Sequence, residues 1–138
     1  MVGDKGLKII LASHGALAKG MKDTLDMIVG NQVSIQAYSA YDEENVDFAS
    51  DISQQITREV NEQFIIVTDV MGGSVNNAMT ELVLRYKMFL ITGMNLPLVL
   101  SLATYSGDLD LKALDELVQE GKRGLINVNK MVESAKEE

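Results

Sequence analysis

The chain contains one histidine, His14, which follows a short apolar run and stands directly before Gly15. The apolar run is typical of a buried strand, and the residues after Gly15 have the apolar spacing of a helix. A lone histidine is more often structural or simply exposed than catalytic, but its place at a turn from strand to helix reverses that expectation. His14 is therefore a candidate for chemistry that uses an imidazole.

A second group of residues that could do chemistry follows another long apolar run. Asp69 stands at the end of that run, and Gly72, Gly73 and Ser74 come shortly after it. If the two strands are neighbours, the carboxylate of Asp69 can accept a hydrogen bond from one ring nitrogen of His14. Such a contact fixes the tautomer and leaves the lone pair on the other nitrogen, ready to accept a proton or attack an electrophile.

The surroundings of this pair favour an anion. Gly15 admits close approach, and the helix after it presents unpaired N–H groups and the positive end of its dipole. Gly72 and Gly73 could form a second backbone nest, with the Ser74 hydroxyl as an added donor. Asp69 and the glycines could also be ordinary turn residues, and Ser74 an ordinary helix cap. Their coincidence at the ends of two strands favours a site for a phosphoryl group bonded to nitrogen.

Strand-like and helical segments alternate along the chain. Strands are predicted at residues 7–13, 34–40, 63–69, 88–92 and 124–129, and the second of them has the alternating pattern of an outer strand. Helices are predicted at residues 16–29, 44–62, 74–87 and 95–105, and from residue 108 or 110 to about 121. This order predicts an α/β fold with an open, mainly parallel sheet and helices on both faces.

Capping residues mark several helix boundaries. Gly30 is predicted to end the first helix, because glycine favours the backbone conformation found there. Asn95 is predicted to cap a later helix with Pro97 in its first turn, where a missing N–H is tolerated. Asp108 or Asp110 is predicted to cap the helix after it.

Composition favours one globular domain, residues 1–138, without a cofactor. The length allows roughly two-thirds of the unfolded surface to be buried, and the chain has no cysteine, which excludes disulfides and cysteine-bound zinc. No dinucleotide fingerprint and no cluster of metal ligands occurs, so neither cofactor nor metal is expected. The net charge of −8 argues against binding to nucleic acid. No signal peptide or membrane-spanning segment is recognisable, so a cytoplasmic location is expected.

Three segments of the chain resemble the enzyme IIA domains of the mannose-type sugar phosphotransferase system. Ser13-His14-Gly15 is similar to the Thr/Ser-His-Gly motif of that family, and DVMGGSVNNA, residues 69–78, resembles its Asp-x-x-Gly-Gly-Ser-Pro-x-Asn loop. TGMNLPLVLSL, residues 92–102, resembles its Gly-x-Asn-Leu-Pro-Met-Leu segment. The similarity runs in the same order over about residues 7–128, with Val75 in place of the usual proline and Met71 in place of a bulky aromatic residue.

The resemblance implies a phosphoryl relay. His14 would accept a phosphoryl group from the phosphocarrier HPr and pass it to an enzyme IIB, which serves a membrane IIC/IID permease. Asp69 would orient Nδ1 of His14 and leave Nε2 as the nucleophile. Ser74 and the amides of Gly72 and Gly73 would contact the phosphoryl group.

The resemblance also implies an assembly. The family fold has flavodoxin-like layers, and an antiparallel strand exchanged between two subunits completes its sheet. Residues 124–129 correspond to that strand, so a homodimer is expected. Independently of the resemblance, the acidic and basic residues of segment 129–138 predict a frayed tail.

Two other functions remain open on the sequence alone. A hydrolase could use Ser74, His14 and Asp69 as a triad, although Ser74 lacks the G-x-S-x-G elbow and more naturally caps a helix. A regulatory domain could use its phosphorylation state to control a transporter or a transcription factor. That function needs the same His14, so the residues do not separate it from a relay.

Overall fold

The computed structural model describes residues 7–30, 34–40, 48–59, 61–70, 74–86 and 88–136. Within these ranges the strands are β1 (Leu7–His14), β2 (Ile35–Ala40), β3 (Gln63–Thr68) and β4 (Phe89–Thr92). The helices are α1 (Leu17–Val29), α2 (Phe48–Arg58), α3 (Ser74–Arg85), α4 (Leu96–Ala103), α5 (Leu111–Arg123) and α6 (Val128–Lys136). None of these described helices has the length and apolar character needed to cross a membrane.

The four strands form one parallel sheet in the order β2-β1-β3-β4. The parallel α/β architecture predicted from the alternating segments is confirmed, and β2 is an outer strand as predicted. The chain passes from β1 to a neighbour on one side and then returns to β3 on the other side. The carboxyl ends of β1 and β3 therefore form the point where strand order reverses, which is where open α/β sheets place their sites.

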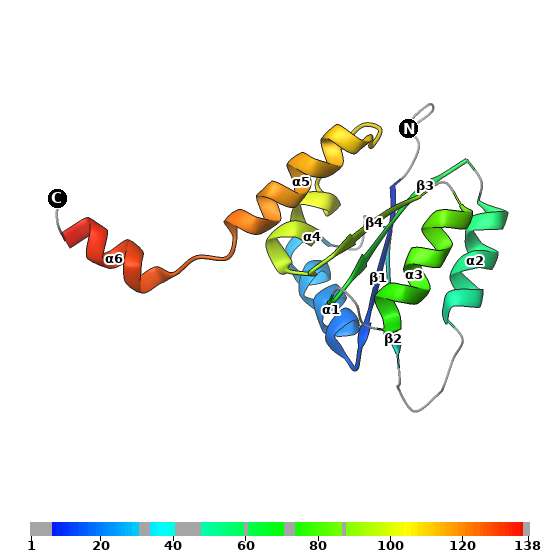
Figure 1. Ribbon diagram of the computed structural model, residues 1–138, viewed down its shortest axis with the longest axis horizontal. Coiled ribbons are helices and arrows are strands. Elements are labelled where there is room, and N and C mark those ends of the chain that lie inside the picture. Colours follow the sequence, from blue (N-terminus) through cyan, green and yellow to red (C-terminus); the bar gives the residue numbers. More distant parts are fainter. Residues whose placement is uncertain are drawn as a thin grey trace.

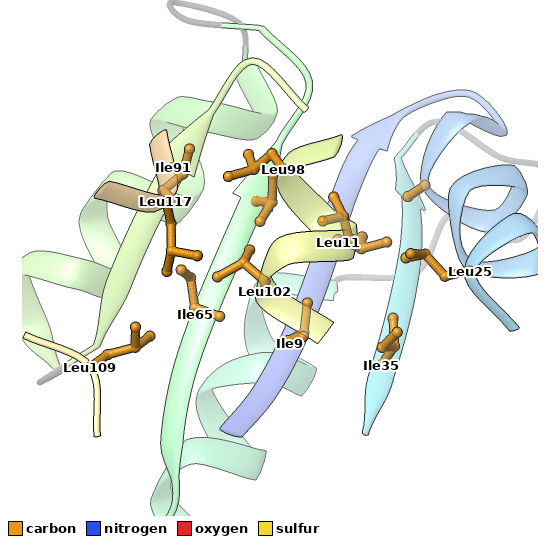
Figure 2. Packing of buried hydrophobic residues seen from close by; sticks show 13 residues of the cluster. Ile9, Leu11, Leu25, Ile35, Ile65, Ile91, Leu98, Leu102, Leu109 and Leu117 are labelled. Atoms are coloured by element: carbon orange, nitrogen blue, oxygen red, sulfur yellow. The ribbon is translucent and has the colours of Figure 1, made fainter. Parts of the chain in front are cut away.

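Helices cover both faces of the sheet, with α1, α4 and α5 on one face and α2 and α3 on the other (Figure 1). Alternate residues of β1 belong to different cores: Ile9 and Leu11 pack with the first layer, and Ile10 and Ala12 with the second. Figure 2 shows the first of these cores, with leucines of α4 and α5 above the strands. Burial on both faces explains why the strand is a continuous apolar run.

The predicted caps are found at three helix ends. Gly30 ends α1 with a φ of +79°, and its N–H bonds to the carbonyl four residues earlier. The side-chain oxygen of Asn95 accepts the N–H three residues later at 2.8 Å, with Pro97 in the first turn of α4. Asp110, and not Asp108, caps α5 in the same way at 2.7 Å.

The helix predicted at residues 44–62 ends earlier than expected. It is described from Phe48 to Arg58 as α2, and residues 44–47 and residue 60 of the predicted region lie outside the described residues. The apolar spacing continues past Arg58, but the next strand already begins at Gln63. The chain needs the intervening residues for a turn, so periodicity alone overestimates the helix.

Two glycines let α4 and α5 meet at close range. A Cβ atom at Gly121 would lie 2.9 Å from Cβ of Leu98, and one at Gly124 would overlap the ring of Pro97. The side-chain nitrogen of Asn95 also donates to the carbonyl of Gly121 at 2.9 Å. Asn95 thus caps α4 with its oxygen and holds α5 with its nitrogen.

The strand predicted at residues 124–129 is not formed in the single chain that the structure describes. Residues 125–127 have no regular secondary structure, and the following residues form α6. A strand needs an edge partner, whereas Asn127 caps a helix by accepting the N–H of Lys130 at 3.1 Å. Residues 129–136 of the predicted frayed tail are helical as part of α6, and residues 137–138 lie outside the described residues. Figure 1 shows α6 apart from the sheet and its covering helices.

Candidate functional site

His14 and Asp69 lie at the same edge of the sheet. His14 is the last residue of β1, and Asp69 directly follows Thr68, the last residue of β3. The two strands are hydrogen-bonded neighbours, with Ala12 of β1 paired to Thr68. The predicted juxtaposition of the histidine and the aspartate is therefore confirmed.

One carboxylate oxygen of Asp69 holds both the backbone and the ring of His14. Oδ2 of Asp69 accepts the backbone N–H of His14 at 2.9 Å and lies 2.9 Å from Nδ1 of the ring. The other oxygen, Oδ1, accepts the backbone N–H of Val70 at 3.0 Å. The Asp69 side chain is 10% exposed and that of His14 is 40% exposed, so a largely buried carboxylate holds an accessible imidazole.

The hydrogen bonds at Asp69 stabilise its ionised form. Burial by itself raises the pKa of Asp69, but hydrogen bonds from His14 and Val70 to the carboxylate outweigh that effect, and the pKa lies below its ordinary value of 3.8. Asp69 is therefore ionised at neutral pH. An ionised carboxylate only accepts hydrogen bonds, so Nδ1 of His14 must be the donor. In the neutral ring, the lone pair then lies on Nε2.

The turn after His14 is shaped by Ser13 and Gly15. Ser13 is fully buried, and its hydroxyl accepts the N–H of Ala18 at 2.7 Å, which links the end of β1 to the first turn of α1. Gly15 has a φ of +56°, in the left-handed region that favours glycine, and no atom lies within 4 Å of where its Cβ would be. Gly15 is therefore required for the conformation of the backbone and not for space.

The predicted phosphoryl-binding loop is only partly within the described residues. Gly72 and Gly73 lie outside them, and so does the side chain of Ser74. The backbone of Ser74 begins α3, as the prediction of a helix start at this residue required. Contacts of these three residues with a phosphoryl group remain predictions.

Three buried or half-buried polar residues beside Asp69 were not identified from the sequence. The hydroxyl of Thr68 lies 2.8 Å from Oδ1 of Asn76, in α3, and 2.9 Å from Oγ1 of Thr92, at the end of β4. Thr68 is completely buried and Asn76 is 6% exposed. The available signal was weak: a threonine that ends an apolar run, and the first of two asparagines in the segment SVNNA.

Among the described residues, no three or more histidine, aspartate or glutamate side chains form a group that could hold a metal ion. Asp69 is the charged partner of His14 in the geometry given above. The arrangement is that of an oriented imidazole at an accessible edge of the sheet.

The chain is similar to known proteins over most of its length. The family model EIIA-man, described as "PTS system fructose IIA component", matches residues 8–120. A sorbose-specific EIIA component of the phosphotransferase system of Klebsiella pneumoniae is 33% identical over 95 residues, covering 67% of this chain and 70% of the relative. A sorbose-specific EIIA component of Lacticaseibacillus casei is 29% identical over 110 residues, covering 78% and 80%.

Solved structures show the same fold. The crystal structure of a putative phosphoenolpyruvate-dependent sugar phosphotransferase system permease from Klebsiella pneumoniae is 30% identical, with a TM-score of 0.81, over 96% of this chain and 97% of that chain. The PTS IIA protein associated with the fucose utilization operon of Streptococcus pneumoniae is 27% identical, with a TM-score of 0.78, over 94% and 98%. The matched region of the family model includes β3 and all of β1 except Leu7, the strands that position Asp69 and His14.

Proposed function

Because the chain belongs to the EIIA-man family of phosphotransferase-system IIA components, we propose that His14 carries the phosphoryl group. The family takes part in phosphoryl transfer in sugar phosphotransferase systems. The observation that carries the proposal is the 2.9 Å contact between Oδ2 of Asp69 and Nδ1 of His14. It supports a ring that keeps its hydrogen on Nδ1 and presents the lone pair of Nε2 to an electrophile.

The proposed reaction is a transfer between two histidines. The lone pair of Nε2 attacks phosphorus in the phosphohistidine of HPr, the new P–N bond forms, and the bond to the HPr ring breaks with its electron pair returning to that ring. The ring of His14 gains positive charge in this step, and the adjacent carboxylate of Asp69 stabilises it. The same exchange then delivers the phosphoryl group to enzyme IIB, so no water or cofactor enters the balance.

The setting of His14 also suits the negative charge of a phosphoryl group. The first turn of α1 follows His14 after two residues, and helix N-termini attract anions through unpaired N–H groups. Ser74 and the amides of Gly72 and Gly73 are proposed to contact the phosphoryl oxygens from the start of α3. Transfer of this kind depends on positioning and charge stabilisation more than on a deep pocket.

Incubation with HPr phosphorylated by enzyme I and phosphoenolpyruvate tests the proposal. We expect one acid-labile phosphoryl group on the wild-type chain, located on His14 by mass spectrometry and assigned to Nε2 by ³¹P NMR. The variant His14→Ala should stay folded and unphosphorylated. An unmodified wild-type chain that is correctly folded would contradict the proposal.

Onward transfer distinguishes a relay from a domain that is only regulatory. Both functions require phosphorylation of His14, but only a relay passes the group to a cognate enzyme IIB that serves an IIC/IID permease. Loss of the phosphoryl group from the chain when IIB is added, with its appearance on IIB, supports the relay. Stable retention in the presence of active IIB would favour the regulatory function.

We also propose that the C-terminal segment pairs with a second copy of the chain to form a homodimer. Leu125 and Ile126 are 89% and 57% exposed, and α6 has no buried residue. Three more apolar side chains are exposed on α6: Val128, Met131 and Val132. Such a run of exposed apolar residues favours a protein partner. Light scattering should give a dimer mass for the wild type and a monomer mass for Leu125→Asp/Ile126→Asp, and a monomeric wild type would contradict the homodimer.

A further inference from the structure

We propose that Thr68 and Asn76, which are buried, and Thr92, which is half-buried, form a polar clamp that positions Asp69 against His14. In this chain the clamp joins β3, β4 and α3 directly behind the site. The inference rests on the proposed function of His14 for its effect on phosphoryl transfer. Its effect on the geometry of the His14 ring is independent of that function.

The backbone of Thr68 is fixed from the side of β4. Its carbonyl accepts the N–H groups of both Gly93 and Met94 at 3.0 Å, and Thr68 and Thr92 form the last pair of the β3–β4 ladder. Asp69 is the next residue along the chain. The end of β3 is therefore held at the point where the chain presents the Asp69 carboxylate to His14.

The side chain of Thr68 is fixed from a second direction. Its hydroxyl lies 2.8 Å from Oδ1 of Asn76 and 2.9 Å from Oγ1 of Thr92. A hydroxyl has one hydrogen, and the amide oxygen of Asn76 can only accept. Thr68 therefore donates to Asn76, and Thr92 donates to Thr68. The result is a directed chain of hydrogen bonds from β4 through β3 to α3.

A purely apolar cluster would fill the same space at lower cost. Burial of a hydroxyl or an amide is unfavourable unless it is hydrogen-bonded, and valine has nearly the shape of threonine without a hydroxyl. Hydrogen bonds differ from apolar packing because they fix direction as well as distance. The polar residues therefore restrict the orientation of the β3 terminus, and with it the carboxylate that follows.

The clamp also connects the two sides of the site. Asn76 is the third residue of α3, whose first residue is Ser74, and it is 6% exposed. Thr68 thus holds the first turn of α3 while the adjacent Asp69 holds His14. Loss of the Thr68 hydroxyl should shift the carboxylate and the helix start relative to each other.

The test compares Thr68→Val, which removes the hydroxyl, with Thr68→Ser, which keeps it. ¹⁵N NMR of the neutral His14 ring reports which nitrogen carries the hydrogen, with or without phosphoryl transfer. We expect a single tautomer with hydrogen on Nδ1 in the wild type and in Thr68→Ser, and a mixture of tautomers in Thr68→Val. The rate of phosphorylation by phospho-HPr should fall about tenfold in Thr68→Val and recover in Thr68→Ser, as for supporting residues around other functional histidines.

Thr80→Val is the matched control. Thr80 lies on the same helix as Asn76 and is exposed, and its hydroxyl donates to the backbone carbonyl of Asn76 at 2.8 Å. The variant Thr80→Val should lose a hydroxyl hydrogen bond similar to one that Thr68→Val loses. It should keep the single tautomer of His14 and the wild-type rate of phosphorylation. A change in Thr80→Val as large as that in Thr68→Val would overturn the specific role of the clamp.

Two results separate failure of the clamp from failure of the proposed function. A wild-type tautomer in folded Thr68→Val overturns the clamp, whatever the transfer activity. Absence of phosphorylation in the wild type overturns the function of His14, while the tautomer still tests the clamp. If Thr68→Val does not fold, the variant Thr92→Val is used instead, because it removes only the half-buried end of the chain of hydrogen bonds. Mixed tautomers of His14 in Thr92→Val support the clamp, whereas a single tautomer overturns the clamp.

Discussion

Oδ2 of Asp69 accepts the backbone N–H of His14 and also contacts Nδ1 of its ring, both at 2.9 Å. One oxygen atom thus contacts both the backbone and the ring of His14. The ring is therefore held in a fixed orientation relative to its own backbone, in addition to being attracted to a negative charge. Rotation of the ring away from Asp69 would break the side-chain contact while the backbone contact kept the carboxylate in place. This relationship explains why a half-exposed histidine can have a defined reactive nitrogen.

The variant Asp69→Asn should transfer phosphoryl groups about 10- to 100-fold more slowly than the wild type, with little change in folding. An amide can still occupy the space of the carboxylate, but it is neutral and can present an N–H group to the ring. It therefore no longer enforces the hydrogen on Nδ1 or stabilises the charge that develops on the ring. Rapid-quench measurement of His14 phosphorylation by phospho-HPr checks the rate, and circular dichroism checks the fold.

Asp26→Asn is the control for that variant. Asp26 lies on α1 and pairs with Lys22 at 2.8 Å, a surface ion pair within one helix. Loss of such a pair has a small effect on stability and should leave the transfer rate unchanged. A wild-type rate in Asp69→Asn, measured beside this control, would remove Asp69 from the reaction.

The stability of the protein should depend on Asp69 at acidic pH. The folded-state pKa of Asp69 lies below the ordinary value of 3.8, so the folded chain binds this proton less readily than the unfolded chain does. The resulting stabilisation is fully present above that ordinary value and is lost as the pH falls through the folded pKa. Urea unfolding as a function of pH should show that the stability difference between wild type and Asp69→Asn shrinks on acidification below 3.8. A constant difference over that range would contradict the depressed pKa.

Much of the fold and the central pair of the site could be predicted from the sequence. Ile10 and Leu11 belong to a run buried on both faces, and the apolar pattern records that burial directly. His14 and Asp69 follow such runs, so parallel pairing alone places them at one edge. Asn95 was predictable as a cap because its contact is only three residues away along the chain.

The remaining features depend on contacts that no local pattern records. Thr68 and Asn76 meet across eight positions in sequence through a packed strand and helix. Gly121 has the pattern of a simple helix end, yet its role is to admit Leu98 of another helix. Residues 124–129 have the apolar composition of a strand, but strand formation requires a partner, and local capping by Asn127 favours a helix instead.

The variant Gly121→Ala should destabilise the chain by about 1–3 kcal/mol, because the added methyl group overpacks the contact between α4 and α5. The added Cβ would lie 2.9 Å from Cβ of Leu98. That atom is bonded directly to the backbone, so it cannot move without shifting α4. Thermal or urea unfolding measures the loss. Alanine tolerated at full stability would show that the two helices separate easily.

Gly15→Ala and Gly20→Ala should change stability in opposite directions, although neither new Cβ would meet an atom within 4 Å. Gly15 has a φ of +56°, so alanine there adopts a left-handed conformation that costs about 1–2 kcal/mol. Gly20 lies inside α1, where alanine is favoured over glycine by roughly 0.5–1 kcal/mol. Urea unfolding of both variants gives the comparison. Because Gly15 also follows His14, its variant should slow phosphorylation as well, whereas Gly20→Ala should keep the wild-type rate. Equal stability changes in the two variants would show that the turn after His14 is not held in the left-handed conformation.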